Sequence, residues 1–176
     1  LVSASYAAQD GFAASEHQTF FFYIPDTPDI SFTSSPSPSY YGQDVTFDIT
    51  LRATNSQAVP TGEVLVNYDP PGLPLGNGVA SFSRTDLPVG QNNLIVSYEG
   101  DPHFFGNLAY LTHEVLPDTT TTTVTSSDET SFPGQDVTFT ITVASTYSGE
   151  SPGGNVTLSG LPGGARTLPL TNGSAT

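Results

Sequence analysis

The chain repeats itself at a spacing of 92 residues. The hexapeptide Gly-Gln-Asp-Val-Thr-Phe at residues 42–47 returns at residues 134–139, and Pro-Asp-Thr at 25–27 returns at 117–119. The match begins with the first residues and runs without a gap to about position 64. A repeat of this length and regularity is typical of consecutive copies of one domain.

This register divides the chain into three parts. Residues 1–26 align with the end of a repeat, residues 27–118 make one complete repeat, and residues 119–176 align with the beginning of another. We therefore expect the first and last parts to be pieces of domains. The two pieces complement each other, although both lack the equivalents of about residues 82–92. The rest of a longer protein could complete them, or strand exchange between neighbouring subunits could do so.

Apolar and polar residues alternate along several short segments of the complete repeat. Val45, Phe47, Ile49 and Leu51 alternate with polar residues, which indicates a strand with one buried face. Turn-forming residues separate such segments, and no stretch has the apolar period of a helix. The pattern predicts an antiparallel β-sandwich. The expected strands, A to G, are residues 30–34, 43–52, 63–68, 73–76, 79–84, 92–98 and 108–115.

The same pattern predicts three further local features. Residues 69–72, Asp-Pro-Pro-Gly, are expected to form a turn. Residues 16–24 are expected to form the closing strand of the first part, because they align with strand G of the complete repeat. Tyr6 and Tyr98, at the end of strand F in two repeats, are expected to be buried, with their hydroxyl groups bonded to backbone.

The charge balance is strongly acidic and excludes some partners. Asp and Glu number 17 against 3 Arg and no Lys, which gives a formal net charge of −14. Such a chain has no positive patch to bind nucleic acid, and an anionic membrane would repel it. Cys is absent, so no disulfide holds the domain together. No apolar run is long enough for a membrane span, and we expect no membrane insertion in this segment.

Five motifs of the complete repeat resemble the bacterial immunoglobulin-like domains of group 3. They are Gly42–Phe47, Pro60–Val64, Asn77–Ala80, Leu87–Gly90 and Tyr98–Phe104. The resemblance implies an all-β chain of tandem immunoglobulin-like (Ig-like) antiparallel β-sandwiches, one complete and two partial. It also implies an extracellular or cell-surface location and a role in spacing, adhesion or assembly, without enzyme activity. The first part departs from the pattern, because residues 6–12 lack the Gly-Asp pair.

The sequence offers no catalytic constellation. The three histidines, His17, His103 and His113, are not matched by one another in the repeat register, and we expect them on solvated strand surfaces. There is no zinc-binding motif, no nucleophile elbow and no phosphate-binding loop. We therefore expect no catalytic residue.

Calcium is the one cofactor that the composition leaves open. This ion takes roughly six to eight oxygen ligands, often from several loops. In a sandwich of this strand order, the segment before strand A lies at the same pole as the F–G turn. Four carboxylates should then approach one another: Asp26, Asp29, Glu99 and Asp101. The alternative is a solvated acidic linker that binds no metal.

Two surface features remain. Phe20, Phe21, Phe22 and Tyr23 are consecutive aromatic residues, and alternate side chains of a strand face opposite sides. Either both faces are buried within the domain, or one face is an interface with another chain. Asn155 and Asn172 each begin a tripeptide that fits the N-glycan acceptor pattern.

These observations favour a structural role. The leading hypothesis is a repeat of a secreted or surface-anchored stalk or extracellular filament, assembled in part by complementation of incomplete domains. Its partners would be neighbouring repeats of the same protein, in a homopolymer or a long tandem array. One alternative is an adhesin module that recognises glycan or protein. Another is a spacer module of a secreted polysaccharide-degrading enzyme.

Overall fold

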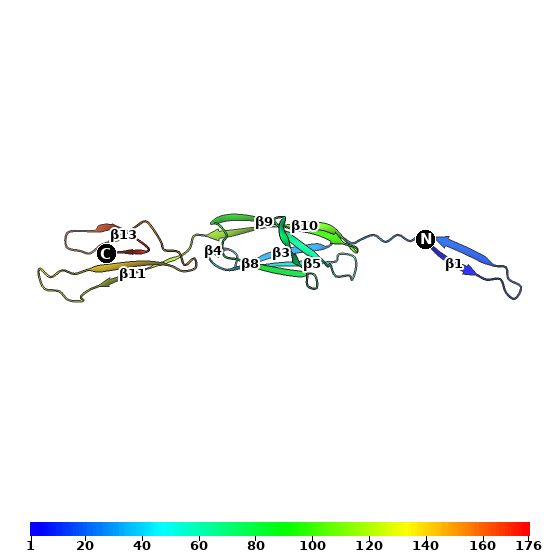
Figure 1. The fold of residues 1–176 in the computed structure, drawn as a ribbon, viewed down its shortest axis with the longest axis horizontal. Helices are drawn as coiled ribbons and strands as arrows, with labels where there is room; N and C mark the ends of the chain where they lie inside the picture. The colour runs from blue at the N-terminus through cyan, green and yellow to red at the C-terminus, as the bar shows by residue number, and fades with distance from the viewer.

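The computed structural model describes residues 1–176, and it contains strands and loops but no helix. Three parts lie in a row along the longest axis: an N-terminal hairpin, a central sandwich and a C-terminal unit (Figure 1). No helix of the length and apolarity needed to cross a membrane is present. The all-β prediction is confirmed.

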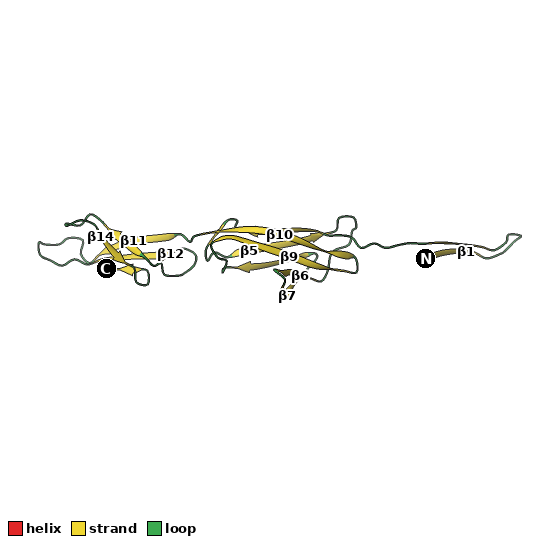
Figure 2. Ribbon diagram, turned by 90° about the horizontal axis from the view of Figure 1, so that it is seen from above, coloured by secondary structure: helices red, strands yellow, loops and turns green.

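The central part is a sandwich of two antiparallel layers. One sheet has the order β3-β5-β8. The other has the order β4-β10-β9-β6-β7, in which β4 runs parallel to β10. Figure 2, seen from above, shows β9 and β10 passing over β5. The strands are β3 Asp29–Ser35, β4 Ser39–Tyr40, β5 Val45–Arg52, β6 Glu63–Val66, β7 Asp69–Pro74, β8 Val79–Arg84, β9 Gly90–Asp101 and β10 Phe104–Leu116.

The core lies between these two sheets. Along β5 the side chains alternate between buried and outward positions, as the sequence pattern predicts. Phe47 and Ile49 are fully buried, and Val64 and Val96 meet them from the opposite sheet. Burying one such side chain contributes about 1.5–3 kcal/mol. Thirteen buried residues form this one cluster, so the central part has a core of its own.

The predicted turn at residues 69–72 is wrong. Those residues begin β7, which pairs antiparallel with β6. The chain reverses instead at Asn67 and Tyr68, which both have positive φ, at 53° and 61°. Two consecutive residues with positive φ form the tight hairpin turn whose twist suits the flanking strands. Strands F and G were expected at 92–98 and 108–115, and both are longer, because β9 and β10 continue to a short turn between Asp101 and Phe104.

The N-terminal part is a single hairpin, β1 Val2–Tyr6 with β2 Ser15–Thr19. All residues of both strands are exposed. The closing strand predicted over residues 16–24 is only partly confirmed, because β2 ends at Thr19. Tyr6 was expected to be buried and is 40% exposed.

The C-terminal part consists of two small sheets, β11-β12-β15 and β13-β14. The register of β11 on β12 repeats that of β3 on β5 in the central domain. The number of tandem domains, and their division at residues 26 and 118, stay predictions. The strands are β11 Thr120–Ser126, β12 Phe139–Ser145, β13 Asn155–Leu158, β14 Arg166–Pro169 and β15 Ser174–Ala175.

Candidate functional site at the domain junctions

Asp26 joins the N-terminal linker to two loops of the central sandwich. Its backbone nitrogen donates to the His103 carbonyl at 2.8 Å, and its own carbonyl accepts from the Phe105 nitrogen at 2.8 Å. Its carboxylate accepts from the Thr54 hydroxyl at 2.7 Å and from the Asn55 backbone nitrogen at 2.8 Å. The Asn55 side-chain amide and the backbone nitrogens of Ser56 and Thr27 also donate to it.

These donors hold the carboxylate in its ionised form. Hydrogen bonds from the Thr54 hydroxyl and the Asn55 backbone, in that order, lower the pKa of Asp26 well below its usual range. Partial burial acts in the opposite direction, and the side-chain amide of Asn55 and the Ser56 backbone add to the lowering. Asp26 is therefore a clamp that fixes the loop between β5 and β6 to the incoming linker.

Asp118 makes the same kind of contact 92 residues later. Its carboxylate accepts from the backbone nitrogens of Tyr147, at 3.2 Å, and Ser148, at 2.9 Å, in the loop after β12. The adjacent Thr119 accepts from the Thr146 nitrogen at 2.9 Å. Burial raises the pKa of Asp118, but the hydrogen bonds from Ser148 and Tyr147 outweigh it, and the net direction is downward. Both linkers of the chain therefore end in one Asp that caps the same loop of the next unit.

Asp101 closes the turn between β9 and β10. Its carboxylate accepts from the backbone nitrogens of His103, at 2.7 Å, and Phe104, at 3.0 Å. The hydroxyl group and backbone nitrogen of Thr61 donate to its other oxygen at 2.7 and 2.9 Å. Burial raises the pKa of Asp101, yet these hydrogen bonds prevail and lower it to about 2.

Tyr98 lies beside this turn, and the prediction of a buried ring with a bonded hydroxyl group is confirmed for it. Its ring is buried, and its hydroxyl group donates to the Thr61 carbonyl at 2.9 Å. Burial, and then the negative charge of Asp101, raise the pKa of Tyr98 to about 12. The phenol is therefore neutral and supports the loop before β6.

His113 was predicted on a solvated surface, and that prediction is wrong. Its side chain is fully buried between the two sheets. The two ring nitrogens lie 2.9 Å from the hydroxyl oxygens of Ser34 on β3 and Ser39 on β4. The ring also meets Phe47 edge-on, with centroids 5.7 Å apart. No local pattern indicates this role, because Ser34 and Ser39 are 79 and 74 positions away in the chain.

A family model described as "Bacterial Ig-like domain (group 3)" matches residues 32–115, which span the sandwich from β3 to β10. The central domain belongs to this family. The searches of curated proteins and of solved structures returned no match. The resemblance inferred from the sequence motifs is thereby confirmed for the central Ig-like domain.

The four carboxylates considered for calcium are not brought together. No group of three or more Asp, Glu, His or Cys side chains lies close enough to hold a metal ion. Asp26 and Asp101 each use their oxygens to accept N–H and O–H groups of the Ig-like domain, while Asp29 and Glu99 are exposed. These contacts give the two buried carboxylates a structural role.

The aromatic segment Phe20–Tyr23 is exposed. Phe20, Phe21 and Phe22 are 73–78% exposed, and Tyr23 is 60% exposed. Phe20 stacks on Phe22 at 6.2 Å, and Tyr23 meets the edge of His103 at 6.1 Å. Burial of both faces within this chain is therefore not observed. Whether the segment is an interface stays a prediction.

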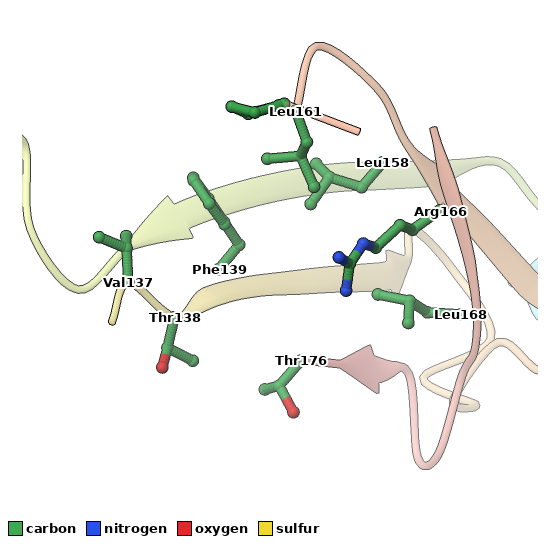
Figure 3. Close-up of a pocket in the computed structure, with 9 residues that line it drawn as sticks. Val137, Thr138, Phe139, Leu158, Leu161, Arg166, Leu168 and Thr176 are labelled. Carbon is green, nitrogen blue, oxygen red and sulfur yellow. The ribbon is translucent and has the colours of Figure 1, made fainter. Parts of the chain in front are cut away.

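A hollow of about 470 Å³ opens in the C-terminal unit (Figure 3). Phe139, Leu158 and Leu161 line it together with Val137 and Leu168. Val137 and Phe139 align with Val45 and Phe47, which are fully buried in the Ig-like domain, but both are partly exposed here. The hollow therefore lies on the face of the C-terminal sheet that corresponds to the face of β5 covered by β9 and β10 in the central domain.

The two candidate glycosylation residues lie on the surface of the same unit. Asn155 begins β13, and Asn172 lies in the turn before β15 with φ of 51°. Both side chains are exposed. Their modification stays a prediction.

Proposed function

We propose that this chain is a structural, non-catalytic segment of a stalk or extracellular filament, in which Ig-like repeats are joined end to end. The family match supports the coarser statement that the central domain is a structural or extracellular module. Domains of this family typically lie outside the cell or on its surface. The acidic composition, with a net charge of −14, suits a long solvated protein, because like-charged molecules repel one another and stay in solution.

The observation that carries the proposal is the recurrence of the Asp clamp. Asp26 binds Thr54, Asn55 and Ser56, and Asp118 binds Tyr147 and Ser148, in the same loop of the following unit. A carboxylate that accepts several backbone N–H groups is a strong, directional contact. Repetition of one linker contact supports a chain built to extend its units in a row.

Small-angle X-ray scattering tests this proposal. A compact protein of this length has a radius of gyration of about 16 Å. The proposal predicts a clearly larger value and a scattering profile typical of a rod. A compact profile would contradict it. Saturable binding in a screen of glycans and surface proteins would favour the adhesin alternative, and hydrolysis by the full-length protein would favour the enzyme-spacer alternative.

A second proposal concerns assembly by complementation, and the repeat register supports it. In the Ig-like domain, His113 of β10 packs against Phe47 of β5. Phe21 aligns with His113, and Phe139 aligns with Phe47. The N-terminal part of a second copy could therefore place Phe21 over the partly exposed Phe139 in the hollow. Strand addition of this kind completes a sheet with backbone hydrogen bonds.

Two substitutions that differ by one position test complementation. Phe21 aligns with buried His113, whereas Phe22 aligns with Glu114, which is exposed. Phe21→Asp should abolish concentration-dependent association in sedimentation velocity, because it would bury an unpaired charge. Phe22→Asp, the control, should leave association unchanged. A parent chain that stays monomeric at every concentration would show that copies of this chain do not complete one another.

A further inference from the structure

The central Ig-like domain touches the C-terminal unit through a short turn, apart from the linker. The turn lies between β4 and β5, and the loop that it meets follows β12. Tyr40 stacks on Tyr147, with ring centroids 5.4 Å apart and planes 4° from parallel. The Tyr41 hydroxyl donates to the Glu150 carboxylate at 3.2 Å, and this bond raises the pKa of Tyr41.

Gly42 permits the closest approach in this contact. A Cβ atom at position 42 would lie 2.7 Å from the backbone nitrogen and the Cβ of Ser148, closer than real Cβ atoms come to other atoms. Its φ of 81° also lies in the region that glycine adopts without strain. Position 42 therefore requires glycine for two reasons: the positive φ of its own turn and the close contact with the next unit.

In the C-terminal unit, the equivalent glycine has the shape of the turn without the contact to another unit. Gly134 aligns with Gly42 and has a φ of 88°, but a Cβ atom there would meet nothing within 4 Å. Both turns are closed by the same glutamine contact: Gln43 accepts from the Tyr40 nitrogen at 3.0 Å, and Gln135 accepts from the Phe132 nitrogen at 3.2 Å. The turn thus forms with or without a partner, and Phe132, at the position of Tyr40, is 83% exposed.

We propose that the turn Tyr40–Gly42 is a docking surface for the loop Tyr147–Glu150 of the Ig-like repeat that follows it in the chain, and that docking fixes the angle between the two units. The inference rests on the proposed function, which it deepens. A stacked pair of rings contributes about 0.5–1.5 kcal/mol beyond its buried area. Because a short covalent linker between Leu116 and Thr120 joins the two units, the contact acts at a high effective concentration. Phe132–Gly134 presents the same surface at the far end of the C-terminal unit.

Distance measurement between two spin labels tests the docking. The chain has no Cys, so Tyr110→Cys on β10 and Thr121→Cys on β11 would carry the only labels. Both positions are exposed. The parent chain should give one narrow distance distribution. Gly42→Ala should broaden it, and Gly134→Ala, which carries the same backbone strain but has no neighbour to meet, should leave it narrow.

A second pair of variants tests the contact without changing the turn Tyr40–Gly42 itself. Tyr147→Ser removes one ring of the stack but keeps the backbone groups that bind Asp118, and it should also broaden the distribution. Phe132→Ser changes the equivalent undocked ring and should not. A distribution that is already broad in the parent chain, or that stays narrow in both Gly42→Ala and Tyr147→Ser, would overturn the proposal. A rod-like scattering profile could persist in either case, so failure of docking is distinguishable from failure of the structural role.

Discussion

His113 is a buried polar residue whose side chain connects the two sheets of the central Ig-like domain. Its ring nitrogens are both satisfied by serine hydroxyl groups, one on β3 and one on β4. A neutral imidazole has one donor and one acceptor, so one serine donates to the ring and the other accepts from it. Burial lowers the pKa of His113, which keeps the ring neutral in the folded protein.

This environment predicts a pH dependence of stability. Unfolded His113 takes up a proton near pH 6.5, whereas the folded residue does so only at lower pH. The unfolded state therefore binds more protons in that interval, and the free energy of unfolding should fall as the pH drops from about 7 towards 5. Chemical denaturation at several pH values measures this change.

His113→Phe is the matching variant, since Phe21 stands at the aligned position of the first part. It should remove the pH dependence between about 7 and 5. It should also cost about 1–3 kcal/mol at pH 7, because the buried hydroxyl groups of Ser34 and Ser39 lose their partner. His103, which is exposed, serves as the control through His103→Phe, which should keep the pH dependence. An unchanged profile in His113→Phe would contradict the role given to this residue.

At the scale of single strands, the sequence predicted those elements whose pattern is local. The alternation from Val45 to Leu51 places β5 correctly, because one face of that strand is buried throughout. The hairpin of β6 and β7 was misplaced, because its turn uses Asn67 and Tyr68 rather than the proline-rich segment beside it. Proline in β7 is tolerated at a sheet edge, where a missing N–H group costs no hydrogen bond.

The site residues were less predictable than the strands, for a physical reason. The sequence pattern predicts Asp26 and Asp101 near one junction as calcium ligands. Their actual partners are backbone and hydroxyl donors of Thr54, Asn55 and Thr61. Such donors are present in every loop, so composition alone cannot indicate which of them a carboxylate meets. The same holds for Gly42, because its close contact with Ser148 of another unit is not visible in the local sequence.

At the scale of the whole molecule, the three parts differ in how far they are closed. The central Ig-like domain has a core of thirteen buried residues, whereas the strands of the N-terminal hairpin are entirely exposed. The C-terminal unit is intermediate, with Ile141 and Val143 buried but Phe139 open to the hollow. The central domain is therefore the part of the chain whose core is closed by its own strands.

Equilibrium unfolding of residues 25–118 alone, a segment that keeps Asp26 and its hydrogen bonds, together with hydrogen exchange, tests whether the central domain folds by itself. A domain with its own closed core should show one cooperative transition, the circular dichroism of a β protein, and slowest exchange for amides of β5 and β9, which lie inside their sheets. A gradual transition without protected amides in these two strands would contradict it, as would a helical spectrum.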